Sequence, residues 1–270
     1  MTVLDYALAF LIYPGALVVV ALGLAIETGA SLAMPQGTQA WRRFALGLRR
    51  LAAEREIPPA ISGTALLVLL AVIQISVPFN PVPTSDRNIL VAGTALAGAS
   101  LLAWPWGVGP RGDNARQLLV TQGGWLASLL ALIIVVGSLR PQVIGEADLG
   151  SILPIKVAAG LTFLLALPGM LGLLQGPVGR EGAARGSRLL LWLPLCGLFA
   201  SLFIPPQSSD AAGLGLFLLA TVAAACAVLL IGAVVSRGTP AVRGGYLLLT
   251  GVLAVLALVL AGLGSFFPAV

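Results

Sequence analysis

The residues that could do chemistry gather in one polar stretch, from Glu27 to Pro59. It is the only long polar interruption in a chain that otherwise alternates apolar runs with short connections. Its charged members are the carboxylates Glu27, Glu54 and Glu56 and the arginines Arg42, Arg43, Arg49, Arg50 and Arg55. The carboxylates stand beside the ends of apolar runs, where they could act in catalysis or simply be solvated at a membrane interface.

The middle of this stretch predicts an amphipathic helix. In a helix from about Thr38 to Glu56, one apolar stripe is flanked by arginines. The stripe is formed by Trp41, Phe44, Leu48 and Leu51, and the flanking residues are Arg42, Arg43, Arg49 and Arg50. Such a helix lies at a membrane surface or under a partner protein.

The rest of the chain is apolar enough to place it in a membrane. Of its 270 residues, 59% are hydrophobic and 9% are charged, and the mean hydropathy is +1.03. Soluble domains carry about 25% charged residues. Apolar runs of about 20 residues cross a bilayer as helices. Eight are predicted: Val3–Ile26, Ala60–Phe79, Ile89–Trp106, Leu118–Leu139, Ile152–Leu174, Leu189–Pro205, Ala211–Val235 and Tyr246–Phe267. The expected fold is an all-α integral membrane protein, one eight-helix bundle over residues 1–270.

The basic residues predict how this bundle is oriented. Twelve of the 15 lysines and arginines fall in the first, third, fifth and seventh connections between the apolar runs. Because basic connections resist translocation, these four are expected in the cytoplasm and both chain termini outside. The charge is spread over short connections, so it indicates a basic membrane face and not nucleic-acid binding.

Three interior features carry expectations of their own. The sequence Tyr13-Pro14-Gly15 predicts a kink, which is either purely structural or opens a lateral gap in the wall of a cavity. Gln74 is expected to form a hydrogen bond to a neighbouring helix. Lys156 is expected to extend its amine to the nearby outer interface.

The missing residue types exclude several kinds of active site. The chain has no histidine, which removes histidine-based haem, zinc and general-base chemistry. Cys196 and Cys226 lie inside predicted spans, and all ten acids lie at span ends or in connections. No nucleophile stands beside a plausible base. The sequence therefore predicts no catalytic residue, no metal site and no cofactor in this chain.

Several short motifs together resemble one known family. They are Tyr13-Pro14-Gly15 with the Gly23–Glu27 segment, the run Arg49–Pro58, Pro78-Phe79-Asn80-Pro81, Arg116-Gln117, and the basic link from Arg237 to Arg243. In these the chain is similar to the subunit 1 or H family, which anchors the peripheral arm of respiratory complex I. The same family occurs in energy-converting, membrane-bound nickel-iron hydrogenases. This chain resembles a degenerate member, because Gln117 and Trp125 stand where the family has acids.

The resemblance implies a non-catalytic membrane core subunit of a proton-translocating oxidoreductase complex in a bacterial or archaeal plasma membrane. Its expected partners are soluble redox subunits with iron-sulfur clusters, antiporter-like membrane subunits and membrane lipids. It leaves quinone binding open, because the family's acids are replaced here. The residues it assigns to a cavity below the soluble arm are Glu27, Glu54, Glu56, Arg116 and Gln117. Those it assigns to docking are Arg42, Arg43, Arg49, Arg50, Arg180, Glu181 and Arg185.

The alternative is a stand-alone transporter or channel for a small solute. In that case the broken helices at Pro14 and Pro168 would form a gate. An inverted repeat, which many transporters contain, is not apparent in the sequence.

Overall fold

The computed structural model describes residues 11–32, 42, 45–46, 49, 59–104, 112–147, 149–174, 183–205 and 210–266. Over these residues the regular secondary structure is helical, which confirms the all-α prediction for this part of the chain. The elements are α2 (Ala16–Leu32), α4 (Pro59–Val72), η1 (Thr84–Asp86), α5 (Ile89–Leu102), α6 (Gly112–Val136), α7 (Pro141–Glu146), α8 (Leu149–Met170), α9 (Ala183–Phe203), α10 (Ala211–Arg237) and α11 (Pro240–Phe266).

Five of these helices are long and apolar enough to cross a membrane. They are α6, α8, α9, α10 and α11, and they make the chain a multi-pass membrane protein. Helices α2, α4 and α5 are apolar too but have 17 residues or fewer in the described part of the chain. Five of the eight predicted spans are thus supported, and the other three stay predictions.

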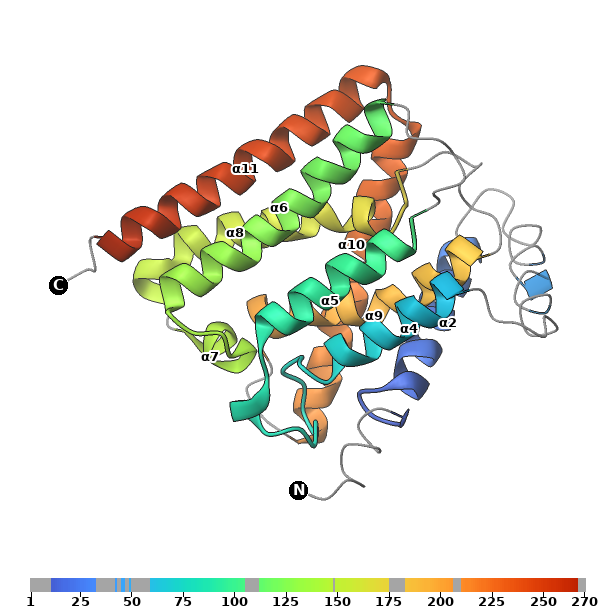
Figure 1. The fold of residues 1–270 in the computed structure, drawn as a ribbon, viewed down its shortest axis with the longest axis horizontal. Coiled ribbons are helices and arrows are strands. Elements are labelled where there is room, and N and C mark those ends of the chain that lie inside the picture. Colours follow the sequence, from blue (N-terminus) through green and yellow to red (C-terminus); the bar gives the residue numbers. More distant parts are fainter. Residues whose placement is uncertain are drawn as a thin grey trace.

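The helices pack in two groups, which are joined by α10 and by direct contacts such as those between α8 and α9 (Figure 1). Helices α6, α8 and α11 contact one another, while α9 is packed against α2, α4 and α10. Helix α5 lies along α4, and α10 also reaches α8. The largest side chains buried between them include Trp125, Phe163 and Trp192. Phe163 of α8 packs against Trp125 of α6, with ring centroids 5.6 Å apart.

Glycines let two helix pairs approach closely. A Cβ atom added to Gly23 on α2 would lie 2.1 Å from the backbone oxygen of Leu189 on α9. One added to Gly169 on α8 would lie 2.3 Å from the Cγ2 atom of Thr121 on α6. Small residues at such crossings favour helix association inside a membrane.

Helix α8 ends in a Schellman motif. Gly172 has a φ of +65°. The N–H of Leu173 donates to the oxygen of Pro168 at 2.8 Å, and that of Gly172 to Gly169 at 3.0 Å. Glycine adopts this left-handed conformation without steric cost. Pro168, where the sequence predicts a kink, thus accepts one of the hydrogen bonds that close the helix.

The helix ends that border the basic connections meet at one end of the molecule. Figure 1 shows the last turns of α2, α5, α8 and α10 beside the first turns of α4, α6, α9 and α11. We call this the arginine-rich end. The grouping agrees with the charge pattern of the sequence, and the assignment of this end to the cytoplasm stays a prediction.

Candidate functional site

Glu27 forms a buried salt bridge with Arg188. It lies on α2 toward the arginine-rich end, and only 3% of its surface is exposed. The guanidinium of Arg188, on the first turns of α9, donates from Nε to Oε1 at 2.5 Å and from Nη2 to Oε2 at 2.7 Å. This is the bidentate geometry in which arginine binds carboxylates most strongly.

A tryptophan completes the site. The indole Nε1 of Trp192 donates to Oε1 of Glu27 at 2.8 Å, and the whole Trp192 side chain is buried. Trp192 follows Arg188 by four residues, so both project from the same face of α9. The two donors therefore hold one carboxylate between them, next to the close contact of Gly23 with Leu189.

These contacts give Glu27 a structural role. Its charge is balanced by Arg188 and both of its oxygens accept hydrogen bonds, so it joins α2 to α9 as a fixed ion pair. The interpretation of Glu27 as a carboxylate solvated at the interface is wrong, because the fold removes it from water. Arg188, which the sequence places in a cytoplasmic loop, lies 161 positions along the chain and was missed as its partner.

The other predicted site residues are spread out or lie beyond the described residues. Arg42, Arg49 and Arg116 are exposed, and Gln117 is half-buried. Arg185 belongs to α9, and nothing of its side chain is described. The remaining predicted positions, which lie outside the described residues, are Arg43, Arg50, Glu54, Glu56, Arg180 and Glu181.

A second polar cluster lies along the first half of α6. The amide Nε2 of Gln122 donates to the hydroxyl of Ser100 on α5. Three buried atoms nearby in sequence lack a partner among the described residues: Nε2 of Gln117, Oε1 of Gln122 and Nε1 of Trp125. Buried polar groups are nearly always satisfied, so these atoms mark where bound water or another polar group would fit.

Lys156 reaches the short helix α7, in the connection that the sequence places at the outer interface, but its amine is buried. Only 5% of the residue is exposed. Its Nζ donates to the carbonyl oxygens of Ile144 at 3.2 Å and Gly145 at 2.7 Å, in the last turn of α7. The last carbonyls of a helix are unsatisfied acceptors that favour a cation. Lys156 therefore ties α7 to α8.

The connection between α4 and α5 is held by similar contacts. Arg87 is 6% exposed, and its Nε and Nη2 donate to the carbonyl oxygen of Val82 at 3.0 and 2.6 Å. Burial lowers the pKa of this guanidinium. The backbone N–H of Asn88 donates to Oε1 of Gln74 at 2.7 Å. Gln74 thus bonds to the residue that precedes α5, close to what the sequence predicts.

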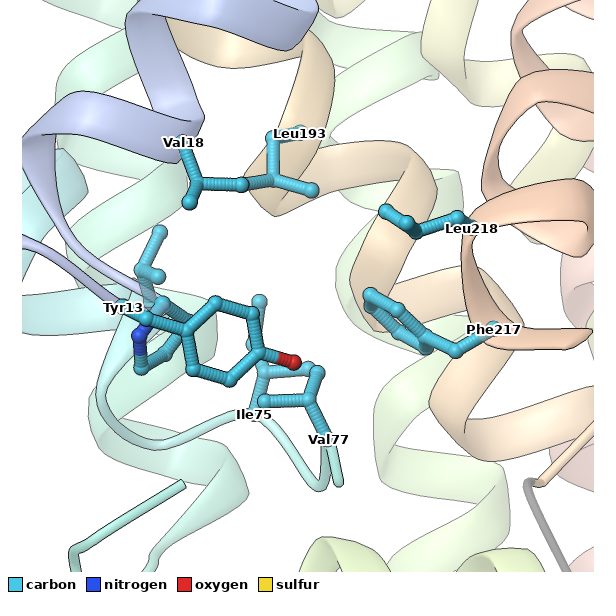
Figure 2. Close-up of a pocket in the computed structure, with 9 residues that line it drawn as sticks. Tyr13, Val18, Ile75, Val77, Leu193, Phe217 and Leu218 are labelled. Carbon is cyan, nitrogen blue, oxygen red and sulfur yellow. The ribbon is translucent and has the colours of Figure 1, made fainter. Parts of the chain in front are cut away.

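A small cavity lies beside the break at Tyr13. Its volume of about 10 Å³ is room for roughly one water molecule. Figure 2 shows the Tyr13 hydroxyl directed into the space bordered by Val77 and Phe217. Residues 12–15 form turns, and α2 begins after them at Ala16, so the predicted kink is a local interruption before the helix.

Fold and site together define a multi-pass membrane protein whose described part is helical and which has a buried ion pair near the arginine-rich end. Over the described residues, no group of histidine, cysteine, aspartate or glutamate could hold a metal ion. No protein-family model matches the chain, and the comparison with curated proteins finds no match.

The chain does share its fold with a subunit of a solved complex. A chain in the structure of the membrane-bound sulfane sulfur reductase, an archaeal respiratory membrane complex, matches it with a TM-score of 0.70. The match covers 96% of this chain and 98% of that chain at 14% sequence identity. At this identity the likeness shows a common fold from end to end.

Proposed function

We propose that this chain is a non-catalytic membrane core subunit of a respiratory assembly of the complex I-like or membrane-bound hydrogenase-like class. The observation that carries the proposal is the fold match to a chain of an archaeal respiratory membrane complex, which spans nearly all of both chains. The sequence motifs of the subunit 1 or H family point to the same class independently of the fold. In such an assembly the chain would dock a soluble redox arm and join it to ion-translocating, antiporter-like subunits.

The proposed docking surface is one part of the arginine-rich end. Arg42 and Arg49 are exposed there, as a surface that meets an acidic partner requires. Charge complementarity of this kind steers association and sets orientation. The proposed contacts are Arg42, Arg43, Arg49, Arg50, Arg180, Glu181 and Arg185. The Glu27–Arg188 pair lies where α2 and α9 support this surface, so its role would be to fix the helices below the arm.

The redox chemistry would belong to the partners. The iron-sulfur clusters of the assembly are proposed to lie in the soluble subunits, and this chain would contribute no catalytic residue. Because Glu27 is already paired, the proposal gives it no proton-transfer role. Glu54, Glu56, Arg116 and Gln117 remain the candidates for the cavity below the arm, where a quinone would also be expected to bind if the complex uses one.

The test is to purify the chain with its natural partners. Gentle detergent extraction from the source membrane by an affinity tag, followed by mass spectrometry, should recover iron-sulfur and antiporter-like subunits at fixed stoichiometry. A mock purification from untagged membranes identifies proteins that bind the resin alone. Recovery of the chain without partners would overturn the proposal. The cavity beside Tyr13 has room for about one water, so it does not favour the transporter alternative.

A further inference from the structure

Two arginines lie on either side of the turn between α10 and α11. Arg237 is the last residue of α10, and Arg243 lies in the first turns of α11. The Nη2 atom of Arg243 donates to the carbonyl oxygen of Ser236 at 2.8 Å, which brings its guanidinium beside the residue that precedes Arg237. We call Arg237, Arg243 and the residues between them the basic corner. It lies at the arginine-rich end (Figure 1).

Among the described residues, the basic corner is exposed and its charge has no acidic partner. Arg237 and all residues from Thr239 to Gly245 are exposed. Neither arginine has a carboxylate partner among the described residues. An added Cβ atom at Gly244 or Gly245 would meet nothing within 4 Å, so the surface beside the arginines is not filled by side chains of the described part of the chain.

Below the charges the surface is apolar. On α10, Leu230 and Val234 precede Arg237 by seven and three residues, which places all three on one face of the helix. These two side chains are 68% and 65% exposed. On α11, Leu248 is 64% exposed and Leu249 is 50% exposed. Each helix therefore has exposed apolar side chains within about two turns of the basic corner.

A cationic cap above apolar helix faces matches the chemistry of one kind of molecule. We propose that the basic corner binds the phosphate headgroup of an anionic phospholipid in the leaflet at the arginine-rich end. Its acyl chains would lie along Leu230 and Val234 on α10 and Leu248 on α11. Arginine forms strong, charge-assisted hydrogen bonds with phosphate, and clustered basic residues beside a membrane helix attract anionic lipids. The site is separate from the proposed docking residues and does not depend on the proposed function.

The experiment compares lipid retention by variants of the full chain. The chain, purified with whatever subunits accompany it, is titrated with phosphatidylglycerol or phosphatidylcholine in mixed micelles, and bound lipid is counted by native mass spectrometry. The wild type should retain phosphatidylglycerol in preference to phosphatidylcholine. Arg237→Gln with Arg243→Gln should weaken phosphatidylglycerol binding about tenfold or more, while the charge-preserving Arg237→Lys with Arg243→Lys should keep most of it.

Two controls make the result specific. Arg140→Gln removes an exposed arginine at the opposite end and should leave lipid retention unchanged. Inorganic phosphate at matched concentration should not displace the lipid, because it lacks the acyl chains. Equal binding of the two lipids, or equal retention by wild type and the double glutamine variant, would overturn the proposal. Loss of a soluble subunit from that variant with lipid retention unchanged would also overturn it and assign the corner to a protein partner.

Discussion

The guanidinium of Arg188 binds both carboxylate oxygens of Glu27, at 2.5 and 2.7 Å, and so fastens α2 to α9 inside the membrane protein. A salt bridge of this kind constrains two helices that are far apart in sequence. It also pairs the carboxylate of Glu27, one of the five residues that the family resemblance assigns to a cavity.

Removing the cation alone should destabilise the protein strongly. Arg188→Met leaves the carboxylate of Glu27 buried, with the Trp192 indole as its one remaining donor among the described residues. Breaking a buried pair in this way costs about 3–5 kcal/mol, which should appear as a lower unfolding temperature in detergent. The matched control is Arg140→Met, which changes an exposed arginine and should have little effect.

The double variant separates charge from packing. Glu27→Leu with Arg188→Met replaces the pair by apolar side chains, and we expect it to regain much of the lost stability. An unfolding temperature for Arg188→Met equal to that of the wild type would contradict the role assigned to the pair.

The two buried tryptophans should respond differently to the same substitution. Trp192→Phe loses a hydrogen bond to a charged carboxylate, which costs about 1.5–3 kcal/mol. Trp125→Phe loses no bond to the described residues, where its indole Nε1 has no partner, so we expect the smaller loss. Unfolding in detergent measures both variants, and a larger loss for Trp125→Phe would show that its indole does have a partner in the native protein.

Gly23 should not tolerate a methyl group. Gly23→Ala places a Cβ atom against the backbone oxygen of Leu189, which cannot move aside as a side-chain tip can. Overpacking of this kind costs about 1–3 kcal/mol, and the Glu27–Arg188 distance should increase as α2 is displaced. The control is Gly29→Ala on the same helix, where an added Cβ meets nothing within 4 Å. Equal stability of the two variants would rule out the close crossing of α2 and α9.

Lys156 should protect α7 against opening. Lys156→Met removes the donor to the carbonyl oxygens of Ile144 and Gly145, so the short helix loses its link to α8. Hydrogen–deuterium exchange should become faster over Pro141–Glu146, while exchange in α10 stays as in the wild type. Unchanged exchange in α7 would mean that its packing against α9 suffices to hold it.

The proposed docking surface can be tested by neutralising four arginines together. Arg42→Gln, Arg43→Gln, Arg49→Gln and Arg50→Gln should release the soluble redox subunits during purification, because the acidic partner loses its counter-charges. High salt should release them from the wild type as well. The control Arg140→Gln should keep them. Retention of the soluble subunits by the fourfold variant at ordinary salt would exclude these arginines as the docking contact.

The apolar runs of the sequence predicted where the helices lie better than where they end. The predicted span Ala60–Phe79 stops being helical at Val72, because the residues that follow turn back and bond to side chains. Asn80 donates to the carbonyl oxygens of Ile73 at 3.1 Å and Ile75 at 3.0 Å. Hydropathy does not distinguish a helix from an apolar turn, since both are rich in the same residues.

The candidate site was only half visible in the sequence. Glu27 is found through a short motif on one helix, whereas its partners Arg188 and Trp192 come from another helix 161 and 165 positions away. The sequence analysis assigned Arg188 to the fifth connection together with the other basic residues there. Its contact with the carboxylate of Glu27 arises from the packing of α9 on α2. The i, i+4 spacing of Arg188 and Trp192 was the one available signal, and it needs a known partner to be interpreted.

The short helix α4 and the folded connection after it have a consequence for the thickness of the membrane beside them. The 14 residues of α4 are about 21 Å long, against a hydrocarbon core of about 30 Å. A crossing at α4 would therefore place residues 73–80 at hydrocarbon depth, where irregular backbone survives only if its polar groups are bonded internally. Asn80 supplies bonds of that kind, and Ile75 and Val77 are buried. Two arrangements would fit a short α4. Residues 73–80 could complete the crossing as a re-entrant segment, or the bilayer could become thinner beside α4. The second arrangement is a hydrophobic mismatch, which would favour a thin membrane or a partner subunit that covers α4.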